Sequence, residues 1–133
     1  LEIKVTNNMF STGWLSRNKE NRADYLKDPM VTVYYTPGLL AMLGALAARS
    51  AGTLWAKKMP KDLPVLVVAG TQDIIGFCGI GVKFANRWMD KAGIKDHTTK
   101  WYKSYRHELF RDDCKEEVYS DITDWLKSKG LPG

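Results

Sequence analysis

The sequence contains few of the residues that build disulfides, metal centres and membrane spans. Only two cysteines, Cys78 and Cys114, and two histidines occur among its 133 residues. The cysteines have no C-x-x-C spacing and no paired ligand histidines, so the sequence predicts two free thiols and no metal site. The longest apolar run covers residues 38–48. It is shorter than the about 20 residues that a membrane-spanning helix needs.

The charged residues do not form the basic stripe of a nucleic-acid-binding domain. The formal net charge is +5, but the densest basic group is only Lys57, Lys58 and Lys61, and acidic residues are interspersed among the rest. We therefore expect no nucleic-acid partner. The composition, 44% hydrophobic and 26% charged, is typical of one globular domain. No signal peptide is visible, and free thiols suit a reducing compartment, so we expect a cytoplasmic protein.

Residues before Pro60 show helical patterns only. Ser16 is a candidate N-cap for a short polar helix that Pro29 would end. Thr36 and Pro37 are typical of the start of a second helix. The apolar residues of that second helix recur at helical spacing and are Leu39, Leu40, Leu43, Leu46 and Ala47. This stripe is consistent with a helix packed on the core of its own segment.

The second half of the chain reads as strand, helix, strand, helix. Residues 65–69 are continuously apolar, as in a strand buried on both faces. An amphipathic helix over 80–92 and a more polar strand over 97–102 complete a βαβ unit. We expect parallel strands with a right-handed crossover. For the last helix, Asp113 and Glu116 have capping-box spacing.

Asp73 and His107 each follow one of these strands. The carboxyl ends of parallel strands lie at the same edge of a sheet, and catalytic groups gather there. A carboxylate that accepts a hydrogen bond from one imidazole nitrogen leaves the other nitrogen free to take a proton from a nucleophile. The non-catalytic alternative is that Asp73 caps a helix or turn and His107 is an ordinary surface residue.

The sequence offers no nucleophile in a recognisable setting. Its serines are Ser11, Ser16, Ser50, Ser104, Ser120 and Ser128, and none lies in a G-x-S-x-G turn. Ser104 is close to His107 but has no oxyanion-hole context. The segment HELFR is not H-E-x-x-H, and GFCGIG is not G-x-G-x-x-G, so neither a zinc-protease nor a nucleotide-binding motif is present. Cys78 is interpreted as a small buried thiol.

Residues 62–126 closely resemble the C-terminal half of the monoacylglycerol lipase and lysophospholipase group of α/β-hydrolases. The resemblance rests on the strand PVLVVAG with its acid loop TQD, on the helix end KAG, and on the loop RHE before the last helix. Residues 14–29 resemble the cap segment of that family. The chain departs from the family at Ile74 and Ile75, in place of Pro-Val, and at Ser104 and Tyr105, in place of glycines. These departures put the substrate in question more than the chemistry.

The resemblance implies an α/β fold, the C-terminal part of an α/β-hydrolase core with parallel strands over residues 60–133, preceded by a helical cap or lid over residues 1–59. Asp73 would be the triad acid and His107 the triad base, with the serine upstream of Leu1. Candidates for substrate binding are Leu39, Leu40, Leu43, Ile74 and Ile75.

The implied substrate is a small-molecule ester or lipid, such as a monoacylglycerol or lysophospholipid, and no cofactor or metal is implied. An apolar cap helix could also serve as a lid that contacts a membrane surface transiently, and an exposed sheet could associate into a homo-oligomer. The alternatives are another reaction on the same fold, such as a peptidase or a dehalogenase, and a non-catalytic interaction module.

Overall fold

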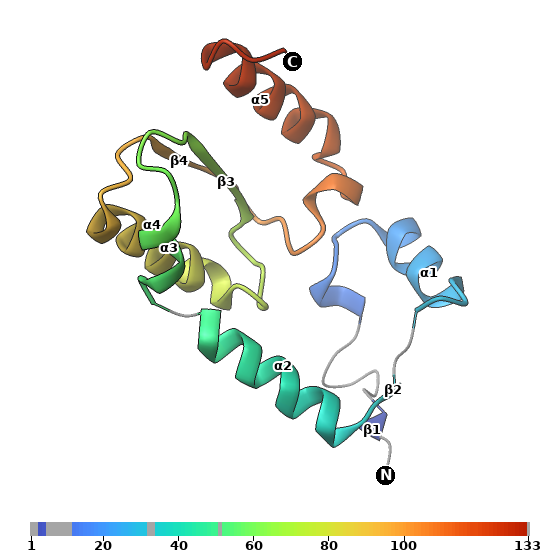
Figure 1. Cartoon of the computed structure of the whole chain (residues 1–133). Coiled ribbons are helices and arrows are strands. Elements are labelled where there is room, and N and C mark those ends of the chain that lie inside the picture. The colour runs from blue at the N-terminus through green and yellow to red at the C-terminus, as the bar shows by residue number, and fades with distance from the viewer. Residues whose placement is uncertain (1–2, 5–11, 32–33, 51, 133) are drawn as a thin grey trace.

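The computed structural model of the chain describes residues 3–4, 12–31, 34–50 and 52–132, and two parallel strands form its centre (Figure 1). Strand β3 (Val65–Gly70) pairs with β4 (His97–Tyr102) from Val65 opposite His97 to Gly70 opposite Tyr102. Helix α4 (Ile80–Ala92) connects them and ends at Gly93 in the left-handed conformation that favours glycine. The predicted βαβ unit with parallel strands is therefore confirmed.

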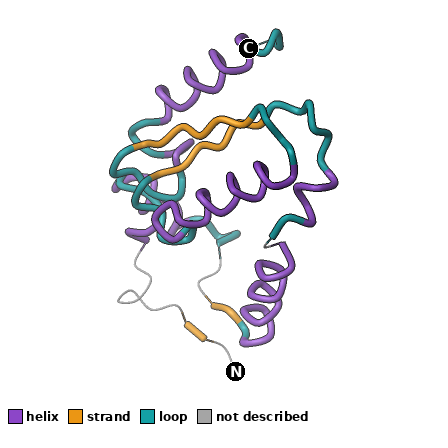
Figure 2. The backbone as a smooth tube through the Cα atoms, turned by 90° about the vertical axis from the view of Figure 1, so that its left-hand side faces the viewer, coloured by secondary structure: helices purple, strands orange, loops and turns teal. Residues whose placement is uncertain are grey.

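Helices cover both faces of this strand pair (Figure 2). On one face, Ala56 of α3 (Leu54–Lys58) and Met89 of α4 are buried with Ile94, and Val65 and Val67 pack against them. On the other face, Val68 packs against a cluster that includes Val118 of α5 (Lys115–Ser128). Successive strand residues point to opposite faces, which explains why β3 is apolar at every position.

Strand β3 is packed on both faces, as predicted, but its burial is incomplete. Residues 65–69 are only half-buried, and Gly70 alone is buried. The physical reason is that β4 is the only strand beside β3 in the described part of the chain. A strand with a single neighbour leaves one edge and part of both faces open to solvent.

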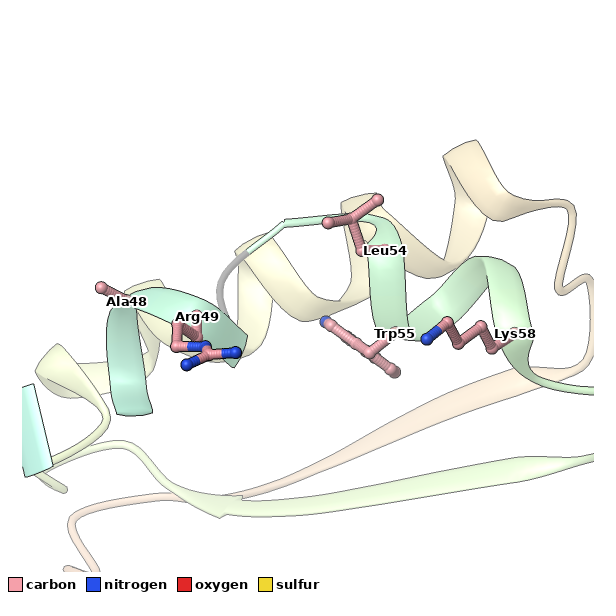
Figure 3. Close-up of a pocket in the computed structure, with 5 residues that line it drawn as sticks. All are labelled: Ala48, Arg49, Leu54, Trp55 and Lys58. Atoms are coloured by element: carbon pink, nitrogen blue, oxygen red, sulfur yellow. The ribbon is translucent and has the colours of Figure 1, made fainter. Parts of the chain in front are cut away.

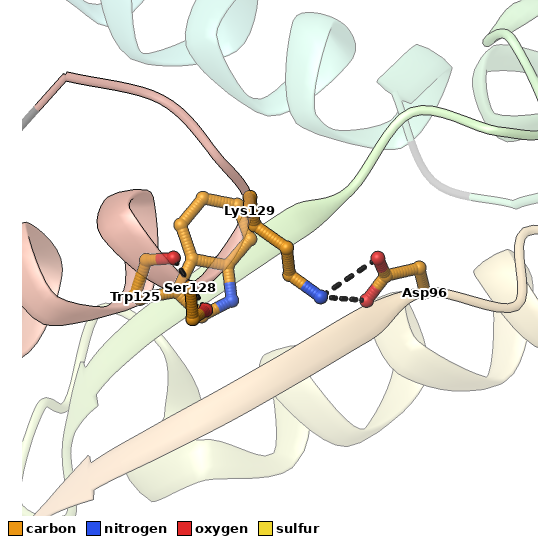
Figure 4. Close-up of polar contacts among 4 residues, drawn as sticks. All are labelled: Asp96, Trp125, Ser128 and Lys129. Atoms are coloured by element: carbon orange, nitrogen blue, oxygen red, sulfur yellow. Dashed lines mark hydrogen bonds and ion pairs between the residues drawn. The ribbon is translucent and has the colours of Figure 1, made fainter.

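The C-terminal end of α5 is fixed to the start of β4 by an ion pair. Lys129 Nζ lies 2.7 Å from both carboxylate oxygens of Asp96 and 5.7 Å from the centre of the Trp125 ring (Figure 4). The predicted capping box at the other end of α5 is wrong. The helix begins at Lys115 without a side-chain cap, and Asp113 accepts a hydrogen bond from the Asn18 amide instead, at 2.7 Å.

The prediction that the N-terminal part of the chain contains only helices is wrong. Strand β1 (Ile3–Lys4) pairs antiparallel with β2 (Tyr34–Tyr35). Between them lie η1 (Thr12–Trp14) and helix α1 (Lys19–Lys27). Asn18 rather than Ser16 caps α1, because its side-chain oxygen accepts the Asn21 N–H at 2.8 Å. The parts of the predicted cap at residues 1–2, 5–11, 32–33 and 51, Ser11 included, lie outside the described residues.

Helix α2 (Pro37–Ser50) starts as predicted but packs differently. Thr36 Oγ1 accepts the Leu39 N–H at 3.1 Å, so Thr36 is the cap, and Pro37 is the first helical residue. No residue of α2 is buried. The side chains of Leu40, Met42, Leu43 and Leu46 are 41–55% exposed, so the prediction of a helix packed on its own core is wrong. Among the described residues, no helix has the length and hydropathy to cross a membrane.

Two small 3-10 segments complete the described elements. Segment η2 (Phe77–Gly79) leads directly into α4, and η3 (Leu109–Arg111) leads into α5. Leu109 is buried in the same cluster as Val118. The loop after β3 therefore ends in α4, and the loop after β4 ends in α5.

Candidate active site

The loops that follow β3 and β4 leave the same edge of the sheet and are bonded to each other. The Thr71 N–H donates to the Tyr102 carbonyl at 3.0 Å, and the Gln72 N–H donates to the Tyr105 carbonyl at 2.9 Å. In return, the Ser104 N–H donates to Thr71 Oγ1 at 2.8 Å. These hydrogen bonds hold residues 71–73 and 102–107 side by side.

Gly70 makes this close approach of the two loops sterically feasible. A Cβ atom at this position would lie 2.3 Å from the Arg106 carbonyl oxygen and 2.4 Å from the Tyr105 carbonyl oxygen. Both neighbours are backbone atoms, so neither can rotate away as a side chain could. The last position of β3 therefore requires glycine because the loop that carries His107 passes directly over it.

Asp73 and His107 meet at this edge. The distance between His107 Nδ1 and Asp73 Oδ2 is 3.0 Å, and Asp73 Oδ1 accepts the Ile75 N–H at 2.9 Å. The two side chains are 18% and 41% exposed for Asp73 and His107, respectively. The structure thus brings together the two residues that the parallel topology predicts at one edge of the sheet. Within the described residues, the one hydrogen-bond partner of the His107 ring is Asp73, through Nδ1, and Nε2 has none.

The arrangement has the first two parts of a proton-transfer relay. A carboxylate bonded to Nδ1 fixes the imidazole tautomer and orientation, and it stabilises the positive charge that forms when Nε2 takes a proton. The backbone N–H of Ile75 fixes the carboxylate in turn. In the described part of the chain, no group of three or more histidine, cysteine or acidic side chains could hold a metal ion.

The turn that follows Asp73 is unusual in its backbone. Phe77 and Cys78 both have φ of 51°, and Gly79 has φ of 91°. Side chains other than glycine rarely adopt this left-handed region. Cys78 is exposed, so its interpretation as a buried thiol is wrong, and its N–H donates to the Asp73 carbonyl at 2.7 Å. Both cysteines are free thiols, as predicted.

The remaining candidate residues fall into two places. Ile74 and Ile75 follow Asp73 directly and are 46% and 50% exposed, so they form an apolar surface beside the Asp73–His107 pair. Leu39, Leu40 and Leu43 lie on α2, a separate element (Figure 1). The described hydrogen bonds and ring contacts do not connect them to the pair.

A cavity of about 550 Å³ lies where α2 is followed by α3 (Figure 3). Its lining residues are Ala48, Arg49, Leu54, Trp55 and Lys58. Neither Asp73 nor His107 lines it, so this cavity is separate from the candidate active site.

The sequence reasoning missed Trp14, which lies beside His107, and Asp112, which follows His107 by five residues. The Trp14 ring centre is 5.5 Å from that of the imidazole. Asp112 is only 1% exposed and accepts the N–H groups of Arg17 and Asn18. No periodicity or motif in the sequence connects residues 14–18 with residues 107–112.

Comparisons with known proteins place the chain in a family. The model of the hydrolase family described as serine aminopeptidase, S33, matches residues 2–114. No curated protein matches the sequence. Solved structures do match. One is a thermostable carboxyl esterase from Bacillus coagulans in complex with glycerol, with a TM-score of 0.76 and 28% identity over 93% of this chain and 41% of that chain.

Two further structures are similar. A monoacylglycerol lipase from Paleococcus ferrophilus has a TM-score of 0.63 and 26% identity over 96% of this chain and 46% of that one. A lipase in its open form has a TM-score of 0.75 and 25% identity over 94% of this chain and 41% of that one. The chain thus spans less than half the length of these neighbours. The parallel strand pair, its covering helices and the family match agree, and the chain belongs to the serine aminopeptidase S33 family of α/β-hydrolases.

Proposed function

We propose that this chain supplies the acid and the base of a serine hydrolase that cleaves carboxylic esters with apolar acyl groups. The observation that carries the proposal is the 3.0 Å contact between His107 Nδ1 and Asp73 Oδ2 at the carboxyl edge of parallel strands. The nucleophilic serine and the oxyanion-hole donors would lie outside residues 1–133. In this proposal residues 1–59 form the cap, and residues 60–133 form part of the catalytic core.

The roles follow from the protonation chemistry of the pair. His107 Nε2 removes the proton from the serine hydroxyl as the serine attacks the ester carbonyl, and it then delivers that proton to the departing alcohol. Asp73 stays ionised and stabilises the imidazolium between these two steps. Water then repeats the sequence on the acyl-enzyme, with His107 again acting as base and then as acid.

An apolar acyl group is supported by the surface beside the pair. Ile74 and Ile75 are both about half-exposed next to Asp73, where Pro-Val was expected from the resemblance. Burying their exposed apolar area against an acyl chain is favourable at about 25 cal/mol per Å². The neighbours named as a carboxyl esterase and a monoacylglycerol lipase support the same class of substrate. The leucines of α2 would cover the far end of the acyl chain.

A peptidase is the second candidate, because the matching family model is described as a serine aminopeptidase. The same acid, base and nucleophile can cleave an amide as well as an ester, so the Asp73–His107 geometry does not separate the two reactions. They differ in what surrounds the acyl group. A peptidase selective for a free amino terminus needs a carboxylate near that terminus, whereas Ile74 and Ile75 offer only apolar surface.

The test uses the full-length protein that contains this chain. Its activity is measured on p-nitrophenyl esters of two to sixteen carbons and on aminoacyl p-nitroanilides, and its active serine is labelled with a fluorophosphonate probe. The proposal expects probe labelling and a preference for esters over anilides. Labelling with a preference for anilides would favour the peptidase. Absence of both labelling and turnover in a folded sample would favour a non-catalytic module.

A further inference from the structure

The loop that carries His107 is tied to a segment about 90 residues earlier in the chain. The Arg17 N–H donates to Asp112 Oδ2 at 2.8 Å, and the Asn18 N–H donates to Asp112 Oδ1 at 3.2 Å. Asp112 Oδ1 also accepts the Asp113 N–H at 2.8 Å. The Asp112 carboxylate is therefore fully engaged, which a side chain that is only 1% exposed requires.

Further hydrogen bonds join the same two segments on either side of His107. Immediately before it, the Arg106 guanidinium donates to the carbonyls of Gly13 and Ser16, the latter at 3.2 Å. Immediately after it, the Glu108 N–H donates to the Leu15 carbonyl at 2.8 Å. The Glu108 side chain in turn accepts the Asn21 amide at 2.9 Å.

The same docking brings an aromatic ring against the imidazole. Trp14 directly precedes Leu15, and its ring centre lies 5.5 Å from that of His107, with 48° between the ring planes. Leu15 and Ser16 are buried at 2% and 0% exposure, so the backbone that presents Trp14 is held firmly. The imidazole is thus in contact with both the Asp73 carboxylate and the Trp14 indole, which limits its rotation.

We propose that Asp112 is a positioning residue for His107: it fastens residues 14–18 to the base loop so that Trp14 holds the imidazole in line with Asp73. This inference rests on the proposed function, since it assigns a role to the residue that would act as base. The buried Asp112 carboxylate makes this connection through directional hydrogen bonds to backbone N–H groups. A loop held only by apolar contacts would be positioned less precisely.

The first test measures kinetics in the full-length hydrolase. Asp112→Ala removes every hydrogen bond to the carboxylate, whereas Asp112→Asn keeps one acceptor oxygen and turns an NH₂ group toward an N–H donor. We expect kcat to fall about 10- to 100-fold in Asp112→Ala, the loss associated with a displacement of about 1 Å, and less in Asp112→Asn. KM should stay within about threefold, because the substrate surface is unchanged.

The matched control is Asp121→Asn. Asp121 also accepts hydrogen bonds on both oxygens, from Lys100 at 3.0 Å and from Tyr102 at 2.8 Å, but neither donor belongs to residues 12–18. All variants are compared at the same interval below their own Tm. If Asp121→Asn lowers kcat as much as Asp112→Ala does, the effect is general destabilisation and the positioning role is wrong.

The second test reads the contact of Trp14 with His107 directly. The ring current of an indole shifts the NMR signals of an imidazole packed against it. At one fixed pH, the ring-proton signals of His107, assigned by their loss in His107→Gln, should therefore move in Trp14→Leu. They should move in the same direction in Asp112→Ala, and by a smaller amount in Asp112→Asn.

The two tests separate the failure of this inference from failure of the proposed function. Unmoved His107 signals in a folded Asp112 variant overturn the positioning role, whatever the activity. Normal turnover by His107→Ala overturns the proposed function, while the NMR signals of His107 in the parent protein still report on the contact. If Asp112→Ala does not fold, Asp112→Asn and Trp14→Leu are measured instead, and undiminished kcat in both would contradict the proposal.

Discussion

The two carboxylate oxygens of Asp73 have different partners, and this division determines what a substitution at either member of the pair removes. Oδ2 faces the imidazole, whereas Oδ1 accepts the Ile75 N–H. An asparagine at this position can keep the bond to Ile75 only by turning its NH₂ group toward Nδ1. The imidazole would then be held in the tautomer that has its proton on Nε2, where it cannot act as a base.

If the proposed function holds, substitutions of the pair in the protein that contains this chain should differ in severity. His107→Ala should lower kcat on the order of a million-fold, because it removes the group that takes the proton. Asp73→Asn should lower kcat less, roughly ten-thousand-fold, because the imidazole and the nucleophile remain in place but the imidazole is held in the wrong tautomer. Both are measured by ester hydrolysis with the active serine titrated. Near-normal turnover by His107→Ala would mean that another residue is the base.

Gly70→Ala should destabilise the fold because it displaces the loop that carries His107. The added Cβ would lie 2.3 Å from the Arg106 carbonyl oxygen, so the loop must shift, and we expect a loss of about 1–3 kcal/mol in the free energy of unfolding. Gly44→Ala is the control, since a Cβ there meets no atom within 4 Å. In the interior of α2 it should stabilise by about 0.5–1 kcal/mol. Urea denaturation measures both, and equal effects would contradict the steric argument.

At the scale of elements, local patterns in the sequence were sufficient where the contacts are local. The strand over 65–69, the helix over 80–92 and the strand over 97–102 match β3, α4 and β4 within one residue. Their apolar spacing and the glycine at the helix end act over a few residues only. The parallel pairing followed from the crossover, and it was enough to bring Asp73 and His107 to one edge of the sheet.

The predictions failed where distant segments compete for the same polar groups. Asp113 was expected to cap α5, but it bonds Asn18, which is 95 residues away. The β1–β2 pairing joins strands of two residues each, too short for any periodicity. Asp112 and Trp14 were missed for the same reason, because their partners are set by the docking of residues 14–18 and not by neighbouring residues.

Helix α2 leads to a prediction about acyl chain length. Leu40→Gln and Leu43→Gln should change the free energy of unfolding by no more than about 0.5 kcal/mol, because both side chains are more than 40% exposed. If these leucines cover the acyl chain, kcat/KM should fall roughly tenfold for long-chain esters and little for acetate esters. Ala45→Gln, on the opposite side of α2, is the control. An equal loss for acetate and long-chain esters would argue against this role.

At the scale of the whole molecule, one buried cluster links β4 to the last helix and contains two weakly acidic side chains, the Cys114 thiol and the Tyr102 hydroxyl. Burial raises the pKa of the Cys114 thiol to about 11. Burial, and then the hydrogen bond to Asp121, raise the pKa of the Tyr102 hydroxyl. Both groups stay neutral in the folded chain up to a higher pH than in the unfolded chain. The stability that each contributes is therefore fully present below the pKa of the unfolded chain and is lost as the pH rises from that pKa through the raised pKa of the folded chain.

The alkaline limit of stability should follow from this cluster. We expect Tm to be steady up to about pH 8.5 and to fall between pH 9 and pH 11, as the unfolded chain releases first the Cys114 proton and then the Tyr102 proton. Cys114→Ala should lower Tm at pH 7 because it leaves a small cavity, and it should weaken the decline between pH 9 and pH 10. Thermal unfolding by circular dichroism measures both. A parallel decline in the variant would exclude the thiol as the cause.

The isolated 133 residues should behave differently from the full-length protein. The apolar strand β3 is half-buried with one strand neighbour, and two strands alone make a marginal sheet. We expect the isolated chain to self-associate or to need additional sequence for stable folding, and to show no esterase activity. Light scattering and p-nitrophenyl ester assays measure these properties. A folded monomer that hydrolyses esters and loses this activity in Ser104→Ala would contradict the assignment of the serine outside this chain.

The long separation between Asp112 and residues 17–18 also has a consequence for synthesis of the protein. The hydrogen bonds of Arg17 and Asn18 to Asp112 join positions 95 and 94 residues apart. A ribosome adds about 5–20 residues per second, so the early segment leaves the tunnel roughly 5–20 s before its partner. During that time Leu15 and Trp14 have no surface to cover them. A nascent chain would then be a ligand for chaperones at the same residues that later hold the imidazole.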